Sequence, residues 1–433
     1  MNDPDVLVIG GGPAGACAAS TLALAGRRAL VIEKEPGPRY HIGESFIPFC
    51  AYPLQRIGFL DKLKASRFTT KYSVVFVGTT GTASRPFWFH QYLYDGASVT
   101  WQVLRSEFDA MLLAHAESLG ASVERGVEAT ALIIEDGAIR GARVRGADGE
   151  REVRAPVTID CSGRDALSHR AFAWRDLDPG LDRFALWGYF EGHRLDDGVA
   201  GGATVVASIP GGGWFWWIPV TDGRLSCGVV ARREDLFVAG ESTKQTWARA
   251  LAQQPWIAER LSAARRVEPL RVIREYSYRA RHAATDGLLL AGDAFGFLDP
   301  IFSSGVFLAL RGGELAAQAA DAALCDGDTS ARAFAAYGAR MSGGIENIRR
   351  FVYAFYDKGF SLNQVMARDP YARADISDLL DGCFFRDYED FFRIVADSAT
   401  LPGPLSDGLP IERAGSRRRD VRRGDARRGG GAG

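Results

Sequence analysis

A glycine-rich turn close to the start of the chain constrains the fold more than any other feature of the sequence. It occupies residues 10–15, after an apolar run over 6–9 and before a stretch of small residues over 16–25. A second apolar run over 28–32 ends at Glu33, 18 residues after the turn. This order of strand, glycine turn, helix and strand with a terminal carboxylate is typical of the Rossmann-type βαβ unit. We therefore predict a dinucleotide-binding domain built on a parallel sheet.

The same turn predicts how the pyrophosphate of a dinucleotide is held. Glycines let the backbone approach the phosphates, and the following helix presents unpaired N–H groups and the positive end of its dipole. The residues that we expect to contact the cofactor here are Gly10, Gly12, Pro13, Ala14 and Gly15. Glu33 can accept hydrogen bonds from ribose hydroxyls, and a carboxylate there favours an unphosphorylated ribose. An ordinary glycine turn without a ligand is the alternative.

Composition excludes several other classes of protein. The 433 residues carry a net charge of −1, so we expect no general attraction for nucleic acid or a membrane surface. A hydrophobic content of 47% is that of a globular chain. The six cysteines are dispersed without a C-x-x-C pair, so neither a disulfide framework nor a metal site is expected. The acidic N-terminus does not resemble a signal peptide and no apolar run could span a bilayer, which predicts a cytoplasmic protein.

Later segments return to the dinucleotide-binding domain. Strand-like runs over 153–160 and 287–290 end at Asp160-Cys161-Ser162-Gly163-Arg164 and at Gly292-Asp293. A dinucleotide that meets both Gly10 and Asp293 threads most of the domain, which suits FAD better than NAD.

Both segments resemble motifs of FAD monooxygenases with the hydroxybenzoate-hydroxylase fold, in which the aspartate of a Gly-Asp-Ala motif holds the ribityl chain. The resemblance implies cofactor contacts at Lys34, Arg39, Ile42, Arg105, Gly292, Asp293, Asp299, Gly305 and Val306. Surface ion pairs are the alternative for Arg39 and Arg105.

The predicted fold class is α/β with an α+β insertion. A Rossmann-type FAD-binding domain is expected to be discontinuous, because a segment over 172–270 alternates like an antiparallel sheet around aromatic residues. The predicted FAD domain covers 1–75, 98–171 and 271–330; the sheet-rich substrate domain covers 76–97 and 172–270; a C-terminal helical cap covers 331–411; a disordered Arg/Gly-rich tail covers 412–433.

The segment Trp214-Phe215-Trp216-Trp217-Ile218-Pro219 is the most diagnostic in the chain. It resembles the W-x-W-x-I-P signature of flavin-dependent halogenases. The resemblance implies that Trp214 and Trp216 stand beside the flavin and keep the organic substrate away from the flavin-bound oxygen. An aromatic core strand without catalytic meaning is the alternative.

A second segment, over 299–306, resembles the halogenase loop whose backbone N–H groups hold halide. Pro300, Ser303, Ser304 and Gly305 would form that site. A turn of serine and glycine can present such a nest of donors, although a plain helix cap at Ser303 or Ser304 is also possible. Phe302 replaces the glutamate of tryptophan halogenases, which disfavours free tryptophan as substrate.

Lys71 is one of only six lysines and lies in a strand-like stretch over 69–76. Its position resembles that of the catalytic lysine of halogenases. The resemblance implies that an ammonium hydrogen-bonds hypochlorous acid or that a neutral amine carries chlorine as a chloramine, and burial favours the neutral amine. A solvated strand lysine is the alternative.

These resemblances imply an oxidoreductase that uses reduced FAD, O2 and chloride or bromide to halogenate an electron-rich phenol or pyrrole, possibly tethered to a carrier protein. A separate NAD(P)H:flavin reductase would supply the reduced flavin, because one dinucleotide fingerprint is present. The alternatives are an FAD-dependent hydroxylase or monooxygenase or a flavin-dependent reductase of the same fold, and, from another class, a non-catalytic flavin-binding protein that uses its basic tail for interaction.

Overall fold

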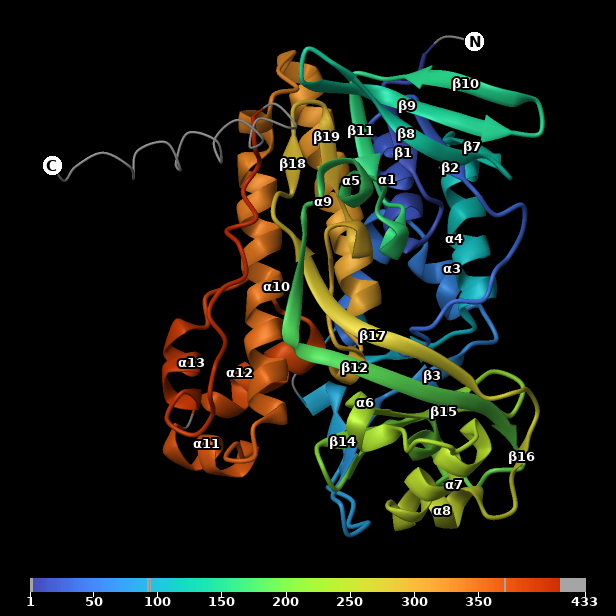
Figure 1. Cartoon of the computed structure of the whole chain (residues 1–433), viewed down its shortest axis with the longest axis vertical. Coiled ribbons are helices and arrows are strands. Elements are labelled where there is room, and N and C mark those ends of the chain that lie inside the picture. The colour runs from blue at the N-terminus through green and yellow to red at the C-terminus, as the bar shows by residue number, and fades with distance from the viewer. Residues whose placement is uncertain (1–2, 92, 94, 370, 413–433) are drawn as a thin grey trace, which may run out of the picture.

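A six-stranded sheet forms the upper part of the molecule (Figure 1). The computed structural model describes residues 3–412 except 92, 94 and 370. The strands of this sheet, in spatial order, are β18 (Ala284–Thr285), β19 (Leu288–Leu290), β11 (Val157–Asp160), β1 (Val6–Ile9), β2 (Ala29–Glu33) and β7 (Ser122–Arg125). All neighbours are parallel except β18 and β19. Every residue of β1 is buried, as expected for a central strand with both faces covered. The α/β class and the Rossmann-type βαβ opening are confirmed.

Three helices accompany this sheet: α1 (Pro13–Leu24), α4 (Arg105–Ser118) and α9 (Gly305–Asp326). Helix α1 packs against both α9 and α4. It begins at Pro13, three residues earlier than the run of small residues suggested, because proline is well suited to the first helical position, where no N–H partner is needed.

The strand expected over 153–160 is two strands. Strand β10 (Gly149–Arg154) pairs with β9 (Ala138–Gly146), which pairs with β8 (Glu128–Glu135), in a separate three-stranded antiparallel sheet. The chain then enters the six-stranded sheet at β11. Pro156 lies between the two strands and has no N–H to donate to a ladder, which explains the break.

A nine-stranded sheet forms the lower part of the molecule (Figure 1). Its path is β20 (Gly296–Phe297), β17 (Arg271–Ala280), β12 (Arg175–Glu191), β15 (Arg224–Ala231), β14 (Gly213–Val220), β13 (Thr204–Ile209), β4 (Ser73–Val77) and β5 (Phe87–Trp88), with β16 (Arg265–Arg266) beside β12. Only β13 and β4 are parallel neighbours. Strand β17, which we expected in the FAD domain, therefore belongs to the antiparallel insertion.

This insertion also carries helices that the alternating pattern did not predict: α6 (Arg233–Leu236), α7 (Thr243–Ala252) and α8 (Pro255–Leu261). A capping box formed by Ser242 and Gln245 starts α7. Trp247 of this helix stacks on Phe190 and meets Phe215 edge-on, so α7 covers the face of the sheet that points away from the six-stranded sheet.

Helices also dominate the C-terminal region. Helix α10 (Ala335–Tyr356) runs along both parts of the molecule, and α11 (Leu362–Arg368), α12 (Ala372–Asp381) and α13 (Glu389–Val395) gather beside its lower end (Figure 1). The tail predicted over 412–433 lies outside the described residues apart from Glu412. Besides short 3-10 helices, the remaining elements are α2 (Ala51–Arg56), α3 (Leu60–Lys64), β3 (Thr69–Lys71), β6 (Thr100–Gln102) and α5 (Leu167–Phe172). Within the described part of the chain, no helix is both long and apolar enough to cross a lipid bilayer.

Glycine makes the crossing of α1 and α9 possible. A Cβ atom on Gly313 would collide with the carbonyl oxygen of Ala14, and one on Gly292 would lie 2.9 Å from the Ala14 Cβ. The two helices therefore approach until their backbones touch, which brings the first residues of both to one place between the two large sheets.

Replacing Gly313 by alanine tests this packing. We expect Gly313→Ala to lower the free energy of unfolding by about 1 to 3 kcal/mol, because α1 must shift to admit the methyl group. Gly343→Ala is the control: Gly343 lies exposed on α10 with nothing near its Cβ position, so alanine should stabilise the helix by about 0.5 to 1 kcal/mol. Urea and thermal unfolding measure both; a stabilising Gly313→Ala would contradict the contact.

Candidate functional site

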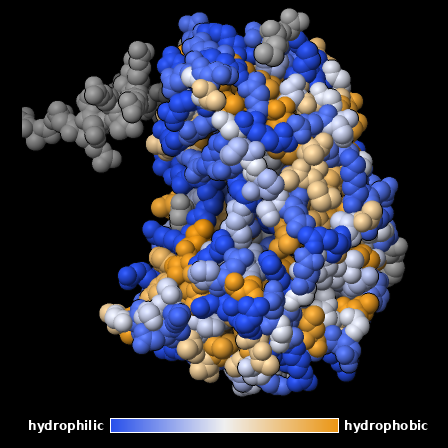
Figure 2. Space-filling model, turned by 90° about the vertical axis from the view of Figure 1, so that its right-hand side faces the viewer, coloured by the Kyte–Doolittle hydropathy of each residue, from blue (hydrophilic) through white to orange (hydrophobic). Residues whose placement is uncertain are grey.

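A cavity of about 550 Å³ is lined by residues from both large sheets. Its upper wall comes from the ends of β1, β2 and β11, the first residues of α1 and α9, and the segment over 39–45; its lower wall comes from β12, β13 and β14. In Figure 2 the outline of the molecule is indented at mid-height, between the parts that carry these two sheets. A volume of this size is typical of a site for a cofactor or an organic ligand.

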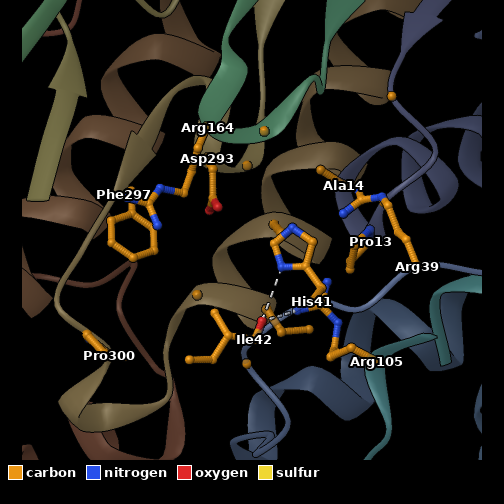
Figure 3. A pocket seen from close by; sticks show the side chains of 18 of the residues that line it. Pro13, Ala14, Arg39, His41, Ile42, Arg105, Arg164, Asp293, Phe297 and Pro300 are labelled. Atoms are coloured by element: carbon orange, nitrogen blue, oxygen red, sulfur yellow. Dashed lines mark hydrogen bonds between the residues drawn. The ribbon is translucent and has the colours of Figure 1, made fainter. Parts of the chain in front are cut away.

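Most of the residues that the sequence analysis singled out meet at this cavity. Those that line it are Gly10, Gly12, Pro13, Ala14, Glu33, Lys34, Arg39, Ile42, Arg105, Trp214, Trp216, Gly292, Asp293, Pro300, Ser303, Gly305 and Val306. Those that do not line it are Gly15, Lys71, Asp299 and Ser304. Figure 3 shows a close view of part of the lining, with Pro13 and Ala14 facing Arg39 and His41.

The three glycines of the turn have three different reasons to be glycine. A Cβ atom on Gly10, whose φ is +102°, would collide with the carbonyl of Cys161 on the neighbouring strand, and one on Gly15 would collide with the carbonyl of Gly10. A Cβ atom on Gly12 would meet only an Arg39 nitrogen, at 3.9 Å, and would otherwise point into open cavity. Gly10 and Gly15 thus shape the turn, while Gly12 leaves room for a ligand.

Glu33 lies at the end of β2 beside this turn. Its two carboxylate oxygens accept hydrogen bonds from the backbone N–H groups of Gly11, at 2.6 Å, and Glu35, at 2.9 Å. These bonds hold the carboxylate at the rim of the cavity, where the Rossmann fold places the acidic partner of a ribose. Open space at the turn, a helix N-terminus and this carboxylate fit the adenosine and pyrophosphate of FAD.

Several charged side chains surround the middle of the cavity. Arg105 is bound by both oxygens of Asp109, at 2.8 and 2.9 Å, and donates to the carbonyl oxygen of Ile42 at 2.8 Å. Lys34 forms an ion pair with Asp165. Burial raises the pKa of Asp293 to about 6, against the lowering effect of neighbouring arginines. Figure 3 shows Asp293 beside Arg164, across the cavity from Arg39 and Arg105.

Asp160 has a structural use in this region. Its carboxylate accepts hydrogen bonds from the backbone N–H and the hydroxyl of Ser162, at 3.0 and 2.5 Å, and from the N–H of Ser168 at 2.8 Å. It therefore fixes the turn after β11, and residues 161–165 of that turn, Arg164 among them, line the cavity.

Strand β14 supplies the indole wall. Because side chains alternate along a strand, Trp214 and Trp216 face the cavity, while Phe215 and Trp217 face the core under α7. The Trp216 indole N–H donates to the Ser226 hydroxyl at 3.1 Å, so its orientation is fixed.

A third indole was missed by the sequence analysis. Trp187 of β12 lines the cavity 6.2 Å from the Trp216 ring, and its N–H donates to the Tyr40 hydroxyl at 2.8 Å. A Cβ atom on Gly228 would lie 2.4 Å from both the Trp187 Cβ and the Trp216 ring, so this glycine admits the two side chains side by side. The alternation of side chains along the strand around residue 187 was the sequence signal that could have identified it.

The segment predicted to bind halide forms a tight turn at the start of α9. A short 3-10 helix over Pro300–Phe302 leads to Ser303, which has a left-handed backbone with φ of 55°, and α9 begins at Gly305. Pro300, Ser303 and Gly305 border the cavity, and nothing lies within 4 Å of a Cβ built on Gly305. The first N–H groups of a helix lack partners within it, so this end can receive an anion.

Ser304, Asp299 and Phe302 of this segment do not line the cavity. Ser304 is buried, and Asp299 caps the short helix by accepting the Ile301 N–H at 3.1 Å. Phe302 stacks on Phe351 with ring centroids 4.7 Å apart. Phe302 therefore belongs to the apolar core beneath α10 and does not line the cavity.

Lys71 is buried behind the cavity wall, with 1% of its surface exposed. Its Nζ donates to the Ser45 hydroxyl at 3.0 Å and to the Phe46 carbonyl oxygen at 2.9 Å. Ser45 lines the cavity and shares a 2.7 Å hydrogen bond with the Thr204 hydroxyl. A serine hydroxyl thus separates the amine from the cavity, which the sequence did not indicate.

Burial lowers the pKa of Lys71 to about 7, because a charged amine loses hydration there. Cys50 and Asp381 act against this lowering of the pKa. The two acceptors around Nζ match the two N–H bonds of a neutral amine, whose lone pair then remains available. This is the state in which lysine is a nucleophile.

Glu44 is a second buried group that the sequence analysis did not select. Its carboxyl group borders the cavity, accepts a hydrogen bond from the Tyr189 hydroxyl, and has its pKa raised by burial. Its position next to Ser45 in the chain was the sequence signal that could have identified it.

Comparison with known proteins agrees with this geometry. A family model described as an FAD binding domain matches residues 3–340. The 1H-pyrrole-2-carbonyl-[peptidyl-carrier protein] chlorinase of Pseudomonas fluorescens is 31% identical over 406 residues, which are 88% of this chain and 89% of the chlorinase. The corresponding brominase of Pseudoalteromonas luteoviolacea is 29% identical over 384 residues, 88% of this chain and 92% of the brominase.

Solved structures show the same fold. A flavin-dependent brominase superimposes with a TM-score of 0.82 at 26% identity, over 92% of this chain and 99% of the brominase. The myxobacterial chondrochloren halogenase superimposes with a TM-score of 0.77 at 28% identity, over 94% of this chain and 99% of that enzyme. With the cradle for FAD, the indole wall and the buried amine, these matches show that the chain belongs to the family of flavin-dependent halogenases.

Proposed function

We propose that this enzyme halogenates an electron-rich aromatic ring, phenolic or pyrrolic, presented by a carrier protein, and that Lys71 delivers the halogen. The observation that carries the proposal is the position of Lys71: a buried amine with a lowered pKa, linked through Ser45 to a cavity walled by three indoles. A carrier-bound substrate is favoured because two relatives that match most of the chain are named for pyrrole on a peptidyl-carrier protein.

When FAD is bound and reduced, its reaction with oxygen would supply the oxidising power that converts halide to hypohalous acid. Glu33 and the turn at Gly12 bind the nucleotide end, and the open N-terminus of α9 holds the halide close to where it is consumed. The indoles of Trp214 and Trp216 close the lower wall of the cavity and keep water and substrate from that position.

Lys71 then accepts the electrophilic chlorine and passes it to the substrate. Its neutral Nζ takes Cl⁺ from hypochlorous acid, and the hydroxide released accepts the Nζ proton to leave as water. An aromatic carbon next attacks the chlorine and the N–Cl bond breaks. The proton that the ring then loses passes to Nζ, which restores the amine. Because Nζ does not border the cavity, the Ser45 side chain has to turn aside for the ring to reach it.

The substrate class is tested by mass spectrometry of reactions that contain reduced FAD, oxygen, chloride and a panel of free and carrier-tethered phenols and pyrroles. We expect a gain of chlorine on a tethered ring and none on free tryptophan, since Phe302 supplies no carboxylate. A gain of oxygen or of hydrogen would instead identify a hydroxylase or a reductase.

Two further proposals concern the surroundings of the enzyme. Reduced flavin comes from a separate NAD(P)H:flavin reductase, because the chain carries a single dinucleotide fingerprint, at residues 10–15. The place of action is the cytoplasm, where thiols stay reduced; the six cysteines are all free.

Replacing Gly12 by valine tests the cofactor cradle. The backbone of Gly12 has φ of −71°, which valine tolerates, so any loss reports on the space that its side chain fills. We expect Gly12→Val to weaken FAD binding by about 2 to 3 kcal/mol, roughly a hundredfold, measured by fluorescence titration. Gly403→Val, at an exposed site with nothing near the Cβ position, is the matched control. Full affinity in Gly12→Val would contradict the cradle.

Replacing Lys71 by alanine tests the halogen-transfer step. We expect Lys71→Ala to bind FAD and let oxygen reoxidise the reduced flavin at a near-normal rate, yet to yield no halogenated product. Lys71→Arg should not restore it, because a guanidinium stays charged. Lys64→Ala, which removes an exposed lysine of α3, should behave as wild type. Stopped-flow absorbance with product mass measures both steps; normal halogenation by Lys71→Ala would remove Lys71 from the reaction.

The pKa of Lys71 predicts a pH dependence. Below about pH 7 the amine is charged and cannot accept Cl⁺, so the rate of halogenation should rise as pH increases through 7 and then level off. Because the chain has six lysines, ¹³C-methylene NMR can follow this side chain, assigned by its absence in Lys71→Ala. A Lys71 titration near pH 10 would contradict a neutral nucleophile.

A further inference from the structure

A partly buried chain of hydrogen bonds joins three distant segments beside the cavity. The indole N–H of Trp214 on β14 donates to the hydroxyl of Tyr356 at 2.7 Å, and that hydroxyl donates to Asp299 Oδ2 at 3.0 Å. Tyr356 is the last residue of α10, and Asp299 begins the turn that leads to α9. One hydroxyl from the C-terminal cap therefore connects the indole wall to the turn for halide.

Asp299 links the Tyr356 hydroxyl to the backbone of the turn before α9. Its other oxygen, Oδ1, accepts the backbone N–H of Ile301 at 3.1 Å, within the short helix that precedes Ser303. The carboxylate is 2% exposed, so water does not compete strongly for these bonds. Movement of the carboxylate would therefore move the peptide groups over 300–303, and Pro300, Ile301 and Ser303 of this segment border the cavity.

The surroundings favour a single arrangement of these groups. Arg183 of β12, 5% exposed, lies over the Tyr356 ring with its guanidinium carbon 4.5 Å from the ring centroid. Burial raises the pKa of Asp299 to about 6, and Arg183 and the bonds from Tyr356 and Ile301 act against that rise. Burial also raises the pKa of Tyr356 well above its usual value, so its hydroxyl keeps the proton that it donates.

We propose that Tyr356 is a positioning residue that, through Asp299, holds the halide turn at a fixed separation from the Trp214 indole. This inference rests on the proposed function, since it assigns the turn over 300–305 to halide. It also gives Asp299 a role in shaping that turn in place of a direct contact with the cofactor. The residues of the FAD cradle are untouched by this chain, so halide binding and FAD binding should respond differently.

The test compares two tyrosine-to-phenylalanine variants on one helix. Tyr356→Phe removes the hydroxyl that bridges Trp214 and Asp299. Tyr353→Phe, one turn earlier, removes a hydroxyl that donates to Asp178, whose carboxylate also binds Arg349. Each variant loses one partly buried hydroxyl that donates to a carboxylate, but only the Tyr356 hydroxyl contacts the turn before α9.

Hydrogen–deuterium exchange of the unliganded proteins provides a readout that needs no activity. We expect Tyr356→Phe to speed exchange in peptides covering 299–308 by about tenfold, the loss of one hydrogen bond to a charged group, and Tyr353→Phe to leave them unchanged. Chloride affinity of the FAD-loaded enzymes, followed by flavin absorbance, should fall about tenfold in Tyr356→Phe only. FAD affinity should stay within about twofold of wild type in both.

A double-mutant cycle with Asp299→Asn checks that the two residues act together. If they do, the double variant should bind chloride more weakly than wild type by a factor much smaller than the product of the two single factors. Additive effects, or equal exchange over 299–308 in the two tyrosine variants, would overturn the inference. So would loss of FAD binding with faster exchange throughout the protein, which would show a general structural role.

The outcomes also separate this inference from the proposed function. If wild type halogenates its substrate while Tyr356→Phe matches Tyr353→Phe in exchange and chloride affinity, the inference fails and the function stands. If wild type forms no halogenated product and binds no chloride, the proposed function fails; selective loosening of 299–308 in Tyr356→Phe would then still show that the tyrosine holds the turn.

Discussion

The contact between α1 and α9 is the constraint on which the rest of this structure depends. Gly313 lets the α9 backbone touch the α1 backbone at Ala14, so the two helices cross with their N-terminal ends on the same cavity. Each end carries unpaired N–H groups and a positive partial charge. One end meets the space left by Gly12, and the other begins at Gly305. A single close approach therefore places two helix N-termini on one cavity, and the proposed function assigns one of them to the cofactor pyrophosphate and the other to a halide.

The two large sheets form opposite sides of the cavity. The six-stranded sheet ends in turns that line the upper side of the cavity, while the nine-stranded sheet supplies its lower wall. Val206 of β13 pairs with Trp216 of β14, and Thr204, two residues earlier on the same face, reaches Ser45. The indole wall and the hydroxyls that approach Lys71 therefore share one strand register. A slip of one residue would turn the indoles into the core under α7.

The C-terminal helices contribute more than a cover. Helix α10 spans both parts of the molecule, and its last turn places Tyr356 between the indole wall and the start of α9 (Figure 1). Helix α12 ends at Asp381, a buried carboxyl group whose charge acts on Lys71. The region that looked from its composition like a cap thus contacts the turn before α9 and acts on the amine of Lys71.

Local patterns in the sequence determined the parts of this protein that depend on near neighbours. The turn at Gly10, Glu33 after the second strand and the alternation of Trp214 and Trp216 follow from backbone sterics and strand geometry, which act over a few residues. The family resemblance added Lys71 and the segment over 299–306.

Tertiary structure alone decided which side chains meet. Ser45 in front of Lys71, Trp187 beside Trp216, and Tyr356 between Trp214 and Asp299 join residues far apart in the chain. The helices of the insertion and the assignment of β17 to the second sheet likewise depend on burial against distant partners. No short-range pattern records such contacts, because the free energy that selects them comes from packing and desolvation in the folded molecule.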